Sequence, residues 1–80
     1  MNPRAKSVKY LDGYKLIITF ENNEIKQFDL QPYLHFNVYR PLQDETFCKK
    51  VMVRDGDGVL YWSDFIDIDP DRAYMESISV

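Results

Sequence analysis

Six aspartates lie between residues 55 and 71, and they are the part of this sequence most able to do chemistry. Carboxylates can bind a divalent cation or present an anionic face to a basic partner. Asp55-Gly56-Asp57-Gly58 could open a helix–loop–helix calcium loop, which needs alternating oxygen ligands, a sixth-position glycine and a twelfth-position glutamate. Counting from Asp55 places Val59, Leu60 and Ile66 at positions five, six and twelve. The spacing argues against calcium, and we expect no metal and no cofactor.

The same aspartates have simpler structural explanations. Asp-Gly pairs suit hairpin turns, because glycine adopts positive φ at little cost and aspartate tolerates it. Asp69 suits a helix N-cap, and Asp71 lies where the helix dipole favours negative charge. Asp64 and Asp67 are explained least well, so an alternative hypothesis is a small-ligand or enzymatic site that uses them together with His35.

Few other residues suggest catalysis. His35 is the only histidine, and catalytic triads and zinc sites need more partners of this kind than the chain offers, so we expect no catalytic residues. Cys48 is the only cysteine and is expected to be a small apolar residue, which fits a reducing cytoplasm. The net charge of −3 argues against direct nucleic-acid binding. The N-terminal residues lack the apolar stretch of a signal peptide, and we expect no membrane association.

The first half of the chain has the alternation of β-strands. A strand containing Val8 and Tyr10 precedes the turn signal Asp12-Gly13. In residues 14–20 the apolar side chains alternate, and a polar turn at residues 21–24 leads to a third strand at residues 25–30. These segments predict an antiparallel three-stranded meander.

The second half mixes helices with another hairpin. We expect a helical turn at residues 31–34, an ordered loop at residues 35–43 and a short middle helix over residues 45–50, capped by Asp44. Residues 51–53 and 59–62 should form a second β-hairpin around the Asp-Gly turn. A C-terminal helix should run from Pro70 to Ser77, with Ala73, Tyr74 and Ile78 facing the sheet. The fold class is therefore α+β, as a single small domain of residues 1–80.

The chain has more aromatic side chains than a core of this size can bury easily. They form either an exposed patch or a cover over the sheet beneath the long loop. We expect weak homodimerisation anchored by Trp62 or Tyr61, and we predict a partner-binding surface on one part of the chain. The aromatics in question are Tyr33, Phe36, Tyr39, Tyr61, Trp62 and Phe65. The predicted surface comprises Tyr61, Trp62, Asp64, Phe65 and Asp67.

The stretches LIITFENNEIKQFDLQPYL, PLQDETFCKKV and DIDPDRAY resemble the bacterial domain-of-unknown-function family 2442 (DUF2442) across nearly the whole chain. Asn22-Asn23 replaces a glycine-bearing turn, Ser63-Asp64 follows the tryptophan where proline is frequent, and Ala73 replaces leucine. The closing Asp-Ile-x-Pro-Asp motif is the most specific part. The matching residues are Phe20, Asp29, Leu30, Phe47, Trp62, Asp67, Ile68, Pro70, Asp71 and Tyr74.

The resemblance implies a small α+β domain for which no catalytic residues are established. Some members of the family are fused to a helix-turn-helix DNA-binding domain, and others are encoded beside small toxin-like proteins. Together with the residues above, this favours a non-enzymatic protein-interaction domain, the antitoxin-like or regulatory half of a bacterial two-protein module. A further alternative is an accessory domain in a DNA-binding complex.

Overall fold

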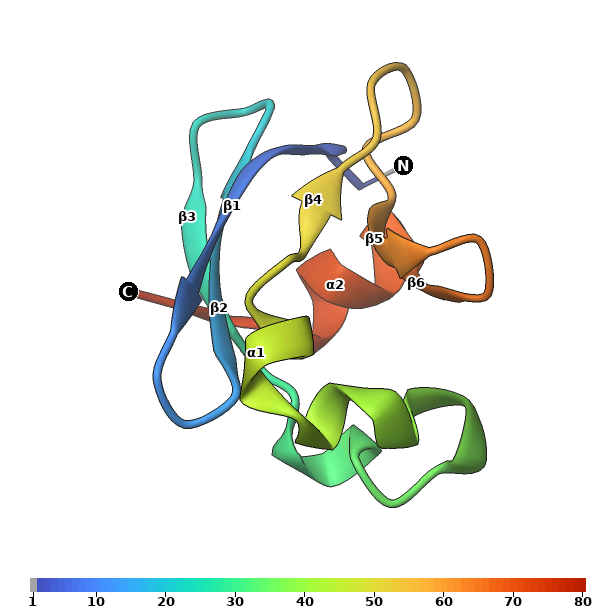
Figure 1. The fold of residues 1–80 in the computed structure, drawn as a ribbon. Coiled ribbons are helices and arrows are strands. Elements are labelled where there is room, and N and C mark those ends of the chain that lie inside the picture. Colours follow the sequence, from blue (N-terminus) through green and yellow to red (C-terminus); the bar gives the residue numbers. More distant parts are fainter. Residues whose placement is uncertain (1) are drawn as a thin grey trace.

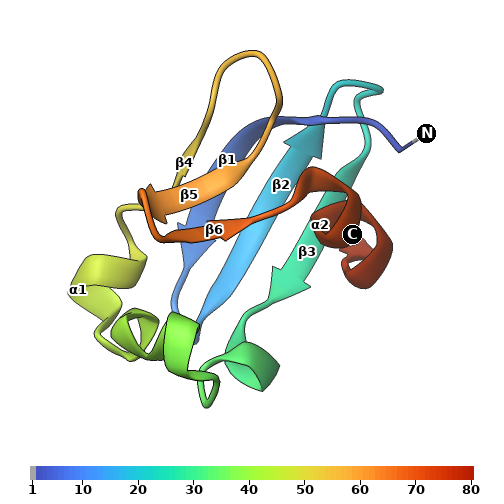
Figure 2. The same ribbon diagram turned by 90° about the vertical axis from the view of Figure 1, so that its right-hand side faces the viewer.

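The computed structural model describes residues 2–80 and contains two antiparallel β-sheets with short helices beside them (Figures 1 and 2). The first sheet has the strand order β1-β2-β3-β7, and the second has the order β4-β5-β6. The predicted α+β class is confirmed. The elements are β1 (Ala5–Leu11), β2 (Lys15–Phe20), β3 (Ile25–Asp29), the 3₁₀ helices η1 (Gln31–Tyr33) and η2 (Asn37–Gln43), α1 (Glu45–Cys48), β4 (Met52–Val53), β5 (Leu60–Ser63), β6 (Ile66–Ile68), α2 (Pro70–Glu76) and β7 (Ile78–Ser79).

The predicted meander forms the main part of the first sheet. Leu16, Ile18 and Phe20 alternate along β2 and are completely buried, as the period-two pattern required. Leu16 lies opposite Phe28 of β3, which is also buried. Tyr14 lies just outside β2, because it occupies the hairpin turn with a φ of 64°.

The predicted hairpin of β4 and β5 is present, but the second sheet also contains a third strand, β6, that was not predicted. The 35–43 loop prediction was wrong as well. Residues 37–43 form the 3₁₀ helix η2, with Pro41 inside it. Ile78 does not face the sheet from the C-terminal helix: it belongs to β7, which pairs with β3, and its side chain is 65% exposed.

Both α-helices begin at the predicted caps. The Asp44 carboxylate accepts a hydrogen bond from the backbone N–H of Thr46 at 3.0 Å. The Asp69 carboxylate accepts one from the N–H of Asp71 at 2.9 Å. Each cap satisfies a backbone donor that the first helical turn leaves unpaired.

The core lies between the two sheets, and α2 closes it on one side (Figure 2). Ala73 of α2 is buried, and the Tyr74 ring meets the Phe20 ring edge-on at 5.0 Å. The Lys26 ammonium lies 4.0 Å from the centre of the Tyr74 ring and donates to the Tyr74 carbonyl at 2.7 Å. These contacts hold α2 against the first sheet, as predicted for Ala73 and Tyr74.

No helix within residues 2–80 is long and apolar enough to cross a membrane.

Candidate functional site

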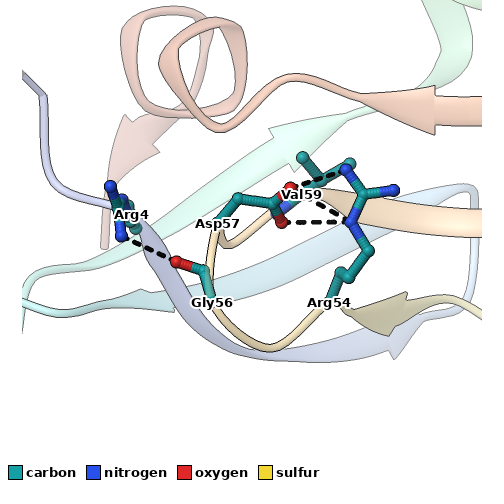
Figure 3. A network of polar contacts seen from close by, with 5 residues as sticks. All are labelled: Arg4, Arg54, Gly56, Asp57 and Val59. Carbon is teal, nitrogen blue, oxygen red and sulfur yellow. Dashed lines mark hydrogen bonds and ion pairs between the residues drawn. The ribbon is translucent and has the colours of Figure 1, made fainter.

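The Asp55–Gly58 segment is a hairpin turn whose polar groups bind one another (Figure 3). The Arg54 guanidinium donates to both carboxylate oxygens of Asp57, at 2.6 to 3.2 Å. The same carboxylate accepts a hydrogen bond from the Val59 N–H at 3.2 Å. The hydrogen bond from Arg54 is the main reason that the pKa of Asp57 is lowered. The turn therefore uses Asp57 structurally, and within residues 2–80 no group of three or more His, Cys, Asp and Glu side chains is placed to hold a metal ion.

This turn packs against, and is hydrogen-bonded to, the residues at the start of the first sheet. The Arg4 guanidinium donates to the Gly56 carbonyl at 2.7 Å (Figure 3). Gly58 has a φ of +72°, and a Cβ atom added there would lie 2.8 Å from the backbone nitrogen of Ala5. The hairpin and β1 thus pack closely enough that only glycine fits between them.

The outer face of the second sheet and the β5–β6 turn beside it carry four of the five predicted partner-binding residues. Met52, Tyr61 and Asp67 lie opposite one another on β4, β5 and β6, forming a row across the sheet. The buried neighbours Leu60 and Ile68 point to the core on the other face. We call this surface, with the β5–β6 turn beside it, the acidic–aromatic face; its residues are Met52, Tyr61, Asp64, Phe65 and Asp67.

Trp62 is not part of this face. Its side chain is 8% exposed, and its indole N–H donates to the Cys48 carbonyl at 2.8 Å. The expectation that Trp62 could anchor a partner at the surface is therefore wrong. Trp62 is buried because consecutive residues of a strand point to opposite faces of the sheet, and Tyr61 points outward. The same alternation places Met52 outside, a surface residue that the sequence analysis missed.

Phe65 is the most exposed large apolar residue of this face. Its side chain is 85% exposed, at the turn between β5 and β6. The backbone N–H of Phe65 donates to the Ser63 hydroxyl at 3.2 Å, which helps to define the turn. The Tyr39 hydroxyl donates to the Asp67 carbonyl at 3.0 Å and ties η2 to β6. Phe65 is therefore presented to solvent by a turn that is held on both sides.

Of the remaining aromatic side chains, some cover the core and others are exposed to solvent. Tyr33 stacks on Phe28 at 5.5 Å and meets Tyr39 at 5.9 Å, so these two tyrosines cover the core beside the 3₁₀ helices. Phe36 is half exposed and lies 4.3 Å from the His35 ring, measured between ring centroids. Some aromatics thus cover the core, and others face solvent.

Charge is divided unevenly along the chain. Residues 1–54 hold nine of the ten Lys and Arg residues and six of the thirteen Asp and Glu residues. Residues 55–80 hold Arg72 and the other seven acids, which gives this segment a formal net charge of −6. Two ion pairs occur within residues 2–80, Arg54–Asp57 and Arg72–Glu76, so the exposed Asp64 and Asp67 keep their charge uncompensated by a direct partner.

The structure gives little support to the alternative ligand or enzymatic site built on Asp64, Asp67 and His35. His35 is exposed in the turn between η1 and η2, where its ring contacts Phe36. Asp67 instead lines an open depression beside the second sheet. That depression is lined by Arg4, Asp57, Val59, Asp67, Asp69 and Pro70.

Cys48 lies in a polar corner of the core. The Tyr10 hydroxyl donates to the Glu45 carboxylate at 2.5 Å, and this hydrogen bond is the main reason that the pKa of Glu45 is lowered. Burial raises the pKa of the Cys48 thiol to about 11. The thiol is therefore protonated near neutral pH, which suits the predicted structural role better than a nucleophilic one.

Two packed antiparallel sheets with capped short helices define a small α+β domain. The protein belongs to the family described as "Protein of unknown function (DUF2442)", whose model matches residues 5–79, and the sequence-based assignment is confirmed. No curated protein matches the chain with significant similarity.

One solved structure shares the fold over nearly the whole chain. It is the crystal structure of "putative DNA binding protein NE0471" from Nitrosomonas europaea ATCC 19718. The two chains are 22% identical with a TM-score of 0.85, and the match covers 96% of this chain and 50% of the other. This chain thus spans about half the length of that protein, and at this identity the likeness concerns the fold.

Proposed function

We propose that the chain is a non-enzymatic protein-interaction domain that binds a basic protein through the acidic–aromatic face. The observation that carries the proposal is Phe65, which is 85% exposed on a turn held in place by its neighbours. A large aromatic side chain at such a position leaves apolar surface in water, and aromatics of this kind dominate the energy of protein interfaces. A partner that covers Phe65 would remove that surface from water.

The charges around Phe65 favour a basic partner. Asp64 and Asp67 are exposed, and residues 55–80, which contain them, have a formal net charge of −6, although one of these carboxylates, Asp57, is paired with Arg54 just outside the segment. Opposite charges on two partners accelerate their encounter and select against acidic competitors, whereas the apolar centre supplies most of the affinity. Tyr61 and Met52 are cross-strand partners and add apolar side chains to the outer face of the second sheet.

We propose more specifically that the partner is a small toxin-like protein. This chain would then be the antitoxin-like or regulatory half of a bacterial two-protein module. Support for this step comes from the family resemblance, since some relatives are encoded beside such proteins. In that arrangement the acidic–aromatic face would cover a basic surface that the toxin-like protein needs for its own activity.

The test begins with the product of the gene next to the one that encodes this chain. Titration calorimetry of the two purified proteins should give a dissociation constant that rises at least tenfold for Phe65→Ala. Phe36→Ala is the matched control, because Phe36 is a half-exposed phenylalanine outside the proposed face. Asp64→Asn combined with Asp67→Asn should weaken binding most at low salt.

Three results would contradict the proposal. The neighbouring protein could fail to bind, the two phenylalanine variants could lose equal affinity, or Phe65→Ala could bind as the wild type does. Circular dichroism of each variant would exclude loss of folding as the cause.

A second candidate is an accessory domain in a DNA-binding complex. It is supported by the name of the Nitrosomonas europaea protein, half of which has the fold of this chain. A net charge of −3 makes this domain a poor phosphate binder by itself, so DNA contact would come from another chain or domain. Gel-shift assays of the isolated chain and of its complex would separate the cases. A DNA shift by the isolated chain at physiological salt would contradict this assignment.

A further inference from the structure

The first sheet has a free edge at β7, and that edge carries apolar side chains. We propose that two copies of the chain associate there, with β7 of one copy antiparallel to β7 of the other about a two-fold axis. The two four-stranded sheets would then form one continuous sheet. This inference concerns a surface separate from the acidic–aromatic face and does not depend on the proposed function.

The backbone geometry of β7 leaves one residue free to pair. Ile78 lies opposite Gln27, Ser79 lies opposite Lys26, and the Val80 N–H donates to the Ile25 carbonyl at 3.3 Å. Backbone groups alternate in direction along an antiparallel strand. Ile78 and Val80 therefore direct their N–H and C=O groups toward β3, whereas Ser79 directs its own toward the free edge.

Aliphatic side chains accompany this edge on the outer face of the sheet. Ile25 is 47% exposed, Ile78 is 65% exposed and Val80 is 70% exposed. Ile78 shares a face with its partner Gln27, and Val80 continues the pairing opposite Ile25, so the three side chains lie together. In Figure 1 the helices and the second sheet lie on the other side of the first sheet, so they leave this face uncovered.

The charge of the edge favours a second copy as its occupant. A two-fold axis places a surface against itself, so any charge on it meets the same charge on the partner. Residues 77–80, Ser-Ile-Ser-Val, carry no charged side chain. The neighbouring Glu76 lies 3.7 Å from Arg72 in an ion pair. The acidic–aromatic face would repel its own copy, whereas the side chains of residues 77–80 carry no charge that would do so.

The short strand also sets the strength of the association. Only Ser79 of β7 offers backbone groups to a partner, and the aliphatic patch is small compared with a standard interface of about 800 Å² per partner. We therefore expect a dissociation constant of roughly 100 μM, at the weak end of specific association.

Sedimentation velocity at about 10 μM to 1 mM tests the inference directly. The wild-type chain should move from the 9.5 kDa monomer toward twice that mass as its concentration rises. Ser79→Pro should remain monomeric, because proline removes the outward N–H and is tolerated on an edge strand at that position. Ile78→Lys should also weaken association at least tenfold, because the two-fold axis brings like charges together.

Phe65→Ala is the control and should dimerise as the wild type does. A wild-type chain that stays at 9.5 kDa up to 1 mM would overturn the inference. Dimers that survive both edge substitutions, or that disappear only with Phe65→Ala, would overturn it as well. Circular dichroism would show that Ser79→Pro is folded, and Ile78→Lys gives an independent result because its side chain is already exposed.

Discussion

Substituting Gly58 with alanine tests the contact between the second hairpin and the first sheet. An added Cβ would lie 2.8 Å from the Ala5 nitrogen and 2.8 Å from the Arg4 Cβ. Two costs combine. The left-handed conformation costs a non-glycine residue about 1–2 kcal/mol, and forcing an extra carbon into a packed contact costs about 1–3 kcal/mol. Gly58→Ala should therefore lower the free energy of unfolding by about 2–5 kcal/mol.

Gly56→Ala is the matched control in the same turn. Gly56 also has a positive φ, +97°, but nothing lies within 4 Å of a Cβ atom built on it. It bears the conformational cost without the steric one, and both variants stiffen the unfolded chain equally. The difference between the two isolates the packing contribution, about 1–3 kcal/mol.

Urea denaturation followed by far-ultraviolet circular dichroism measures both variants at equilibrium. In a domain of this size, each kcal/mol should also lower the melting temperature by about 4–8 °C. Unfolding free energies within about 0.5 kcal/mol of each other would show that the hairpin is not packed against β1 as described. A changed denaturant slope would indicate an altered unfolded state instead of a lost contact.

Trp62→Phe should lower the free energy of unfolding by about 2–4 kcal/mol in urea melts, because it removes a buried hydrogen-bond donor and leaves space in the core. Asp69→Ala should cost about 0.5–2 kcal/mol, and an unchanged urea midpoint would show that the cap contributes nothing. The lowered pKa of Glu45 contributes stability above its ordinary value of 4.5, and this stability should be lost as the pH falls through the lower folded pKa. Urea melts at several pH values below 4.5 should show that the free energy of unfolding depends less on pH in Glu45→Gln than in the wild type. An equal pH dependence would contradict a stabilising hydrogen bond between Tyr10 and the Glu45 carboxylate. Calorimetric titration with calcium should show no binding tighter than millimolar, because Arg54 already occupies the carboxylate of Asp57; micromolar binding would contradict the hairpin assignment.

The parts of the fold that were predicted correctly are those with strong local signals. Alternating apolar residues placed Leu16, Ile18 and Phe20 in the core, and capping chemistry located the starts of both α-helices. The elements that were missed depend on distant partners. Ile78 and Ser79 form a strand only because β3 has an edge available for pairing. A two-residue segment contains too little local pattern to predict such a strand.

The candidate site shows the same division. Asp64, Phe65 and Asp67 are exposed, as a surface site requires, because turn residues and alternation are local properties; that they bind a partner stays a prediction. Trp62 was placed on the wrong face, although its separation from Leu60 by two residues could have revealed that both point inward. Its carbonyl acceptor on α1 could not have been found, since nothing local relates residue 62 to residue 48.

The burial of Trp62 gives the molecule a built-in optical probe. Trp62 is the only tryptophan of the chain, and its indole N–H joins β5 to the end of α1. Its fluorescence therefore reports on one defined contact in the core, whereas circular dichroism reports on the backbone of all strands and helices. If the second sheet or α1 separates before the first sheet unfolds, the emission will shift at a lower denaturant concentration than the dichroism does. Coincident transitions would instead indicate that the two sheets unfold as one cooperative unit.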